Sequence, residues 1–361
     1  MNRLSEPACP KELFPIVSPE SRTESLDYTF ESVRPEVEAI RGRIERLRRR
    51  LAEFFVAKQE VVDLMVLCTF AQEPLLLVGK PGTAKSDLIV KFVQALGVTG
   101  ERYFEYMLTK FTEPSEILGP VDINELKTGR YLRRTGGKLP EAQIVFLDEI
   151  FKSSSAILNT LLTIVNERKY YQDGRPLPVP LIMLFGATNE IPQFSELGAL
   201  RDRFTLKVES LPVQDGHFER LIQKGLQNEA YKTFGQKPWE GVSSLEDFLK
   251  LKVYFDHLLH RRQASGALTD HEGLDETVFP PELFVLFKRM IRTLVKEDRL
   301  EMTDRKVIKL YKLIRARAFL FHGGVVTKED LGLLRYVADR LEDFEPVRAK
   351  VDGLLRVSED P

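Results

Sequence analysis

The chain has 361 residues, of which 43% are hydrophobic and 30% are charged. This length suits a large domain with a smaller one attached. The 53 basic residues almost cancel the 54 acidic ones, so the chain lacks the overall basic excess that is typical of nucleic-acid-binding proteins. The two cysteines, Cys9 and Cys68, have neither metal-ligand spacing nor a disulfide pattern. No apolar run approaches the ~20 residues that span a bilayer, and the first residues lack an apolar signal core, so we expect a cytoplasmic protein without membrane attachment.

The first segment of the chain, residues 1–34, is polar and proline-rich, and we interpret it as a leader. From Pro35 the pattern becomes helical and strongly basic, with Ile44, Leu47 and Leu51 on one stripe. Two interpretations stay open for this helix. Its arginines could bind nucleic acid, but the interleaved glutamates favour a solvated face beside a packed stripe.

Three short apolar runs then alternate with helical patterns. The runs are residues 75–78, 144–147 and 181–187, and the helices are residues 87–96 and 157–165. Continuous apolar strands between helices indicate an α/β fold whose parallel sheet is covered on both faces. Beyond about Leu211 the alternation stops. We therefore predict an αβα nucleotide-binding core at 35–212 and an all-helical lid at 213–361, the latter broken at residues 234–242 and 263–276.

A glycine-rich segment joins the first apolar run to the helix after it. Backbone amides of such a loop converge on phosphates at a helix N-terminus. The lysine before the helix would reach the β- and γ-phosphates, and the next hydroxyl would bind Mg²⁺. An alanine replaces the usual glycine before that lysine, which we expect to be tolerated if it keeps helical dihedrals. The predicted nucleotide-binding residues are Gly79, Lys80, Pro81, Gly82, Thr83, Ala84, Lys85 and Ser86.

Two acidic residues, Asp148 and Glu149, follow the second apolar run. They would lie at the carboxyl edge of the sheet, where ligands of open α/β sheets bind. We expect Asp148 to hold Mg²⁺ together with Ser86. Glu149 would polarise the water that attacks the γ-phosphate, because phosphoryl transfer depends on positioning and charge neutralisation.

Three further polar residues are candidates for the same reaction. Asn189 follows the third apolar run and could hydrogen-bond the attacking water or the γ-phosphate. Arg203, with Arg201 in reserve, could reach a neighbouring subunit's γ-phosphate. Arg305 lies at a predicted helix start that Thr303 or Asp304 would cap, and it could reach the nucleotide from the second domain.

Taken in order, these five motifs resemble those of AAA+ ATPases. The roles would be Walker A for 79–86, Walker B for Asp148 and Glu149, sensor 1 for Asn189, arginine finger for Arg203 and sensor 2 for Arg305. Further segments are similar to the MoxR family and to its RavA-like branch. These are 81–86, 111–120, 146–152, 166–168, 304–306 and 313–319.

The resemblance also implies two hairpin insertions. One would span residues 119–137, and the other would span 168–179 with its turn at 172–175. Candidate contacts to client proteins on them are Arg130, Tyr131, Tyr170 and Tyr171, although aromatic residues in hairpins also pack across strands.

The resemblance implies an ATP- and Mg²⁺-dependent, hexameric, chaperone-like remodeller that works beside a protein with a von Willebrand factor A domain. A DNA-dependent motor and a non-hydrolysing nucleotide-gated adaptor are the alternatives. The near-zero net charge disfavours the DNA motor. Only Ala84 supports the adaptor. The region Val56 to Gln59 is where we expect the adenine.

Overall fold

A computed structural model describes residues 28–194, 197–213, 215–260 and 275–357. Most of the predicted leader and of the polar loop at 263–276 lies outside these residues, as does Cys9. In the described part of the chain, no helix combines the length and apolar character needed to cross a membrane.

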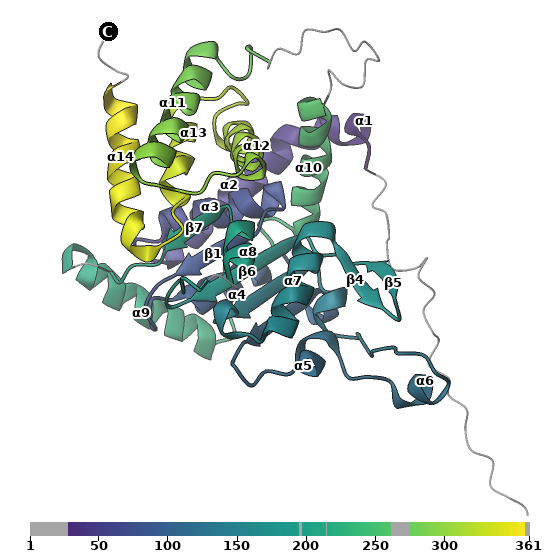
Figure 1. The fold of residues 1–361 in the computed structure, drawn as a ribbon. Helices are drawn as coiled ribbons and strands as arrows, with labels where there is room; N and C mark the ends of the chain where they lie inside the picture. The colour runs from purple at the N-terminus through teal and green to yellow at the C-terminus, as the bar shows by residue number, and fades with distance from the viewer. Residues whose placement is uncertain (1–27, 195–196, 214, 261–274, 358–361) are drawn as a thin grey trace, which may run out of the picture.

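A five-stranded parallel sheet forms the centre of the molecule (Figure 1). Its strand order is β2-β3-β6-β1-β7, and every neighbouring pair is parallel. The three inner strands are apolar over most of their length. They are buried because helices cover both faces of the sheet. The strands are β1 (Leu75–Val78), β2 (Tyr103–Met107), β3 (Ile144–Asp148), β6 (Met183–Thr188) and β7 (Leu206–Glu209).

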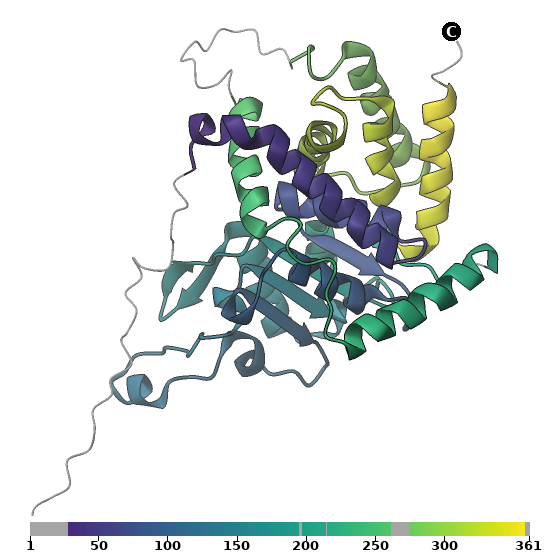
Figure 2. The ribbon, with the colours of Figure 1, turned by 180° about the vertical axis from the view of Figure 1, so that it is seen from behind.

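The helices of the core carry apolar stripes at helical spacing. On α2 this stripe includes Ile44, Leu47 and Leu51, all of which are buried as predicted. Figure 2 shows α2 crossing the back of the molecule. The core helices are α1 (Phe30–Val33), α2 (Val37–Phe54), α3 (Gln59–Ala71), α4 (Lys85–Ala95), α5 (Pro114–Leu118), α6 (Ile123–Lys127), α7 (Ser155–Glu167) and α8 (Gly198–Arg203).

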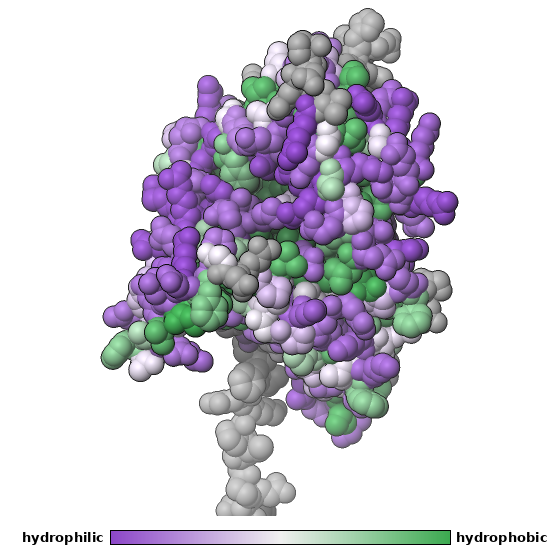
Figure 3. Space-filling model, turned by 90° about the vertical axis from the view of Figure 1, so that its left-hand side faces the viewer, coloured by the Kyte–Doolittle hydropathy of each residue, from purple (hydrophilic) through white to green (hydrophobic). Residues whose placement is uncertain are grey.

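The chain beyond β7 is helical throughout its described residues. Helices α10 and α12 pack against α3, so the C-terminal region rests on the N-terminal helices of the core. The α9 helix has no buried residues, and Figure 3 shows the side of the molecule where it lies, hydrophilic with scattered apolar patches. The helices are α9 (Phe218–Thr233), α10 (Leu245–His260), α11 (Pro281–Glu297), α12 (Asp304–Phe321), α13 (Lys328–Leu331) and α14 (Phe344–Val357).

An αβα core with a helical region after it confirms the predicted fold class. Two strands were not predicted. β2 is an edge strand, and its residues range from buried to exposed along the strand. β7, at the opposite edge, contains a lysine, Lys207. Neither strand forms the continuous apolar run by which the other three were recognised.

Candidate functional site

The glycine-rich segment connects β1 to α4 as a tight loop. Its first residue, Gly79, has φ of 155°, and a Cβ there would come within 2.6 Å of the Ser210 carbonyl oxygen. The Gly79 N–H donates to the Thr188 carbonyl at 3.1 Å. The loop is therefore held between β6 and the segment after β7, at a distance that only glycine allows.

A chain of side-chain contacts supports this loop from behind. The Thr83 hydroxyl donates to the Lys80 carbonyl at 2.9 Å, and the Ser210 hydroxyl donates to the Thr83 carbonyl at 2.8 Å. Lys58 donates in turn to the Ser210 hydroxyl at 2.9 Å and to the Leu211 carbonyl. Sequence reasoning missed the roles of Lys58 and Ser210, because neither belongs to a recognisable motif.

Ala84 corrects one expectation about the loop. Its φ of 64° and ψ of 20° are left-handed, not helical, and it occupies the N-cap position of α4. The methyl group is accommodated in spite of this conformation, which costs an L-residue roughly 1–2 kcal/mol. The alanine form of the motif is therefore strained but well formed.

Lys85 begins α4 and is buried. Its Nζ donates to the carbonyls of Gly79, at 2.5 Å, and Lys80, at 3.1 Å, and to the side-chain oxygen of Asn189 at 3.2 Å. Burial lowers the pKa of Lys85, and Asp148 and Glu149 oppose that shift. The ammonium group is thus placed between the loop, the end of β6 and two carboxylates.

Asp148 and Ser86 bring hard oxygen ligands together. Ser86 Oγ lies 3.3 Å from Asp148 Oδ2, and the other oxygen of Asp148 accepts the Glu149 N–H at 2.9 Å. Hydroxyl and carboxylate oxygens are the protein ligands that Mg²⁺ uses beside water and phosphate. The donor set and its position beside Lys85 therefore fit a magnesium–nucleotide complex.

Glu149 is held in an unusual conformation at the end of β3. Its φ of 52° is left-handed, and its carboxylate accepts a hydrogen bond from the Asn189 side-chain amide. Its second oxygen, Oε2, is buried, accepts no hydrogen bond within the described chain and forms a 3.4 Å ion pair with Lys152. A buried carboxylate oxygen with free acceptor capacity is suited to hold a water molecule.

The arginine candidates form contacts of their own. Arg203, at the end of α8, pairs with Asp202 at 3.1 Å, and its buried Nε has no hydrogen-bond partner among the described residues. Arg201 donates to the Pro192 carbonyl at 2.5 Å. Arg305 is exposed on the first turn of α12, which the Thr303 side chain caps as predicted.

A cavity of about 250 Å³ opens beside the predicted adenine region. Ala57, Lys58 and Gln59 line one side, and Tyr336 and Arg348 of the C-terminal region line the other. Burial and the nearby charge of Lys85 lower the pKa of Lys58 to about 8. The cavity lies where the core meets the C-terminal region and shares Lys58 with the loop support.

Comparison with known proteins identifies the family of the chain. The family model for the MoxR domain in the MoxR-vWA-beta-propeller ternary systems matches residues 42–246, more than half of the chain. The chain belongs to the MoxR family of AAA+ proteins. Its membership of the RavA-like branch stays a prediction.

Individual relatives agree with this MoxR assignment. An uncharacterized protein of Methanocaldococcus jannaschii is 32% identical over 81% of this chain and 70% of its own length. The chaperone MoxR1 of Mycobacterium tuberculosis is 26% identical over 47% of this chain and 46% of its own. A crystal structure of a candidate ATPase from Cytophaga hutchinsonii superposes with a TM-score of 0.63, covering 90% of this chain and 97% of that one at 15% identity. That likeness shows a shared fold.

Of the two insertions expected from the MoxR resemblance, one has the predicted form. Strands β4 (Lys169–Gln172) and β5 (Arg175–Pro178) pair as an antiparallel hairpin. The insertion at 119–137 also folds back on itself, with an antiparallel bridge between Val121 and Arg133, but it carries the short helix α6, capped by Asp122, before its turn.

The candidate client contacts on these insertions differ in how exposed they are. Tyr131 and Tyr171 are about half exposed, whereas Tyr170 is buried and cannot serve as a surface contact. Arg130 pairs with Glu125. The two insertions touch each other, since the Tyr131 N–H donates to the Asp173 carboxylate at 3.2 Å.

Proposed function

We propose that this MoxR protein binds ATP and hydrolyses it. One observation carries the proposal. Lys85, Asn189, Glu149, Asp148 and Ser86 come from α4 and from the ends of β3 and β6, yet they form a connected set at the carboxyl edge of the sheet, joined by three side-chain contacts and the Glu149 N–H. These are the groups that phosphoryl transfer needs for charge neutralisation and for positioning water.

The chain's own residues divide this work. The backbone amides of the loop 79–86 hold the phosphates, and Lys85 exchanges its carbonyl partners for phosphate oxygens. Bound Mg²⁺, held by Ser86 and Asp148, neutralises phosphate charge. Glu149 accepts a hydrogen bond from the attacking water and aligns it, while Asn189 keeps the Glu149 carboxylate in place.

The cavity beside Ala57 to Gln59 is the proposed adenine site. It is lined by residues from the core and from the C-terminal helices, so a bound base would contact both. Nucleotide binding would therefore fix the position of the lid relative to the core. The cavity is small and partly apolar, as base-binding sites are.

We further propose that hydrolysis requires an oligomeric ring, with a hexamer as the expected form. Within the described chain, no arginine is among the groups that contact the set. An arginine from the neighbouring subunit would supply the positive charge that the transition state needs. Arg203 is the residue we propose, with Arg201 in reserve and Arg305 acting in cis.

The biological role follows from the family. The matching model describes MoxR domains in systems that include a vWA protein, and one relative is named a chaperone. We therefore propose a chaperone-like remodeller that works with a von Willebrand factor A domain protein in the cytoplasm. The alternative of a DNA motor is weakened at Arg48 of the basic helix, which is paired with both Glu45 and Asp63.

Nucleotide binding and turnover test the proposal. Titration with ATP and Mg²⁺ should give saturable binding that Lys85→Ala abolishes and that Lys224→Ala, on exposed α9, leaves unchanged. Release of phosphate should depend on Mg²⁺ and follow the same pattern. Equal binding by wild type and Lys85→Ala would refute the assigned site.

A further inference from the structure

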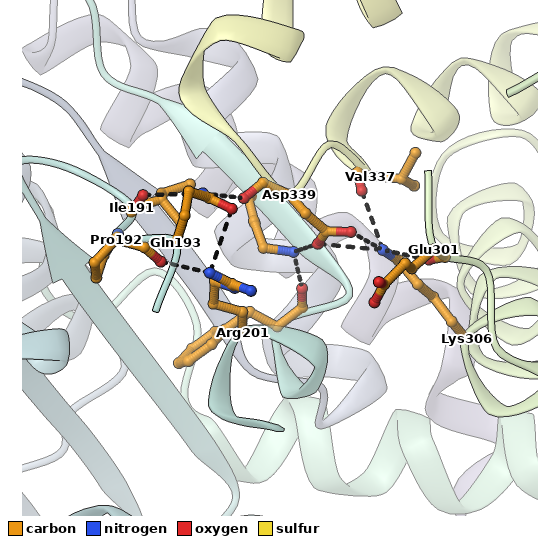
Figure 4. A network of polar contacts seen from close by, with 10 residues as sticks. Ile191, Pro192, Gln193, Arg201, Glu301, Lys306, Val337 and Asp339 are labelled. Carbon is orange, nitrogen blue, oxygen red and sulfur yellow. Dashed lines mark hydrogen bonds and ion pairs between the residues drawn. The ribbon is translucent and has the colours of Figure 1, made fainter. Parts of the chain in front are cut away.

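An ion-pair network connects the core to the C-terminal region (Figure 4), and its Lys207 also lines the cavity proposed as the adenine site. At its centre Lys207 of β7 is fully buried. Its Nζ donates to the Asp339 carboxylate at 2.8 Å and to the Phe204 carbonyl at 2.7 Å. Phe204 is the C-cap of α8 and directly follows Arg203.

Asp339 is shared with a second buried lysine. Lys306 of α12 approaches the same carboxylate at 3.1 Å and donates to the Val337 carbonyl at 3.2 Å. Burial raises the pKa of Asp339, but the two lysines outweigh that effect and lower it, so the carboxylate is charged. Asp339 thus joins β7 to the helix that carries Arg305.

The backbone of Asp339 makes a second connection to the last turn of α8. Its carbonyl accepts from the Gln193 side-chain amide at 3.4 Å, and Arg201 donates to the Gln193 side-chain oxygen at 3.4 Å and to the Pro192 carbonyl (Figure 4). The C-terminal turn of α8 is therefore tied to Asp339 twice, at Phe204 through Lys207 and at Arg201 through Gln193.

The desolvation of these charged groups costs free energy, which argues against a purely stabilising role for the network. Two buried lysines and a partly buried carboxylate must lose water, and a well-packed apolar set of similar volume is often as stable. The charged set instead specifies one geometry, because Asp339 and Lys207 hydrogen-bond only in one arrangement of α8, β7 and α12.

We propose that Asp339 is a positioning residue that sets α8, and with it the arginine supplied to the neighbouring subunit, according to the position of the C-terminal helices. The inference rests on the proposed function, because it requires an arginine of α8 to act in trans. A phosphate that draws Arg305 inward pulls the same turn of α12 as Lys306. The displacement passes through Asp339 and Lys207 to Phe204, next to Arg203.

The test uses mixed assemblies. Wild-type subunits are mixed with a large excess of hydrolytically silent Glu149→Gln subunits, so that most wild-type sites face a silent neighbour. The silent subunits carry Asp339→Asn, Arg203→Ala, Asp343→Asn or no second change. Asp343 lies four residues further along and serves as the matched carboxylate control. Turnover per wild-type subunit is the measured quantity.

The neighbour's Asp339→Asn should lower turnover of the wild-type sites at least about tenfold, because a catalytic group misplaced by ~1 Å can cost about a hundredfold. Arg203→Ala should do the same, and Asp343→Asn should not. A simple structural role for Asp339 would affect only the subunit that carries the change. Unchanged wild-type turnover beside Asp339→Asn neighbours, with equal incorporation, would overturn the proposal.

A second variant covers the case in which Asp339→Asn does not fold. Lys207→Met, Lys306→Met and Asp339→Leu together remove the network without leaving a buried charge unpaired. In silent subunits this triple variant should also lower the neighbour's turnover, and unchanged turnover would again overturn the proposal. If wild type alone lacks assembly-dependent turnover, the proposed function itself fails.

Discussion

The Asn189 side chain bridges Lys85 and Glu149. Its oxygen accepts from the Lys85 ammonium at 3.2 Å, while its amide donates to the Glu149 carboxylate. The two groups expected to meet the γ-phosphate and its attacking water are thus held in one network by a residue at the end of β6. In the sheet order β6 lies between β3 and β1, so Asn189 stands between the segments that carry Glu149 and Lys85.

Replacing Glu149 by glutamine should separate binding from hydrolysis. Glu149→Gln keeps the shape of the side chain but loses the basic oxygen, so turnover should fall at least about a hundredfold. ATP affinity should stay within a few-fold of wild type. Phosphate release and equilibrium binding measure the two effects. Glu229→Gln on exposed α9 is the control, and undiminished turnover of Glu149→Gln would exclude Glu149 as the base.

Gly79 should be far less replaceable than its neighbour Gly82. A Cβ on Gly79 would meet the Ser210 carbonyl at 2.6 Å, whereas a Cβ on Gly82 would meet nothing within 4 Å. Both residues have positive φ, so the comparison isolates the clash. Gly79→Ala should lower the melting temperature and ATP affinity more than Gly82→Ala. Equal losses would mean that the close approach to Ser210 has no energetic weight.

Ala84→Gly should stabilise the protein. Ala84 adopts a left-handed conformation that glycine accepts freely, so relief of strain should exceed the extra entropy of the unfolded chain by roughly 0.5–1 kcal/mol. Ala39→Gly, on the exposed face of helix α2, should instead cost ~1 kcal/mol. Denaturant unfolding measures both. Destabilisation by Ala84→Gly would contradict the assigned conformation.

Lys58 should give folding stability a pH dependence. Burial and Lys85 lower its pKa from 10.5 to about 8 in the folded chain. Between these values the unfolded chain binds more protons, so the contribution of Lys58 to stability rises with pH through this window. The free energy of unfolding of wild type minus that of Lys58→Met should therefore increase from pH 8 to pH 10. A constant or falling difference would contradict the shift.

The parts of the fold that were predicted share a local signal. Continuous apolar runs ending in glycine, acidic residues or asparagine indicated β1, β3 and β6, and the motif residues follow those strands directly. β7 was missed because Lys207 interrupts its apolar pattern. The partner that makes this lysine compatible with burial, Asp339, lies 132 residues away.

The residues that hold the phosphate loop in place were not predicted, for a similar reason. Lys58 and Ser210 act on the phosphate loop through contacts between segments distant in sequence, at a separation of 152 residues. The insertion at 119–137 was predicted as a hairpin, and its antiparallel bridge agrees, but the short helix α6 that Asp122 caps was not predicted. Local composition indicates a turn but does not decide which elements it joins.

The central claim is that the catalytic site is completed by a neighbouring subunit. Steady-state ATP hydrolysis measured across protein concentration, for wild type, Glu149→Gln and Arg203→Ala, tests it most directly. Turnover per wild-type subunit should rise cooperatively with concentration, and both variants should lose it, with Glu149→Gln still binding ATP. Turnover that is independent of concentration, or that survives the loss of Arg203, would contradict the proposed arginine in trans.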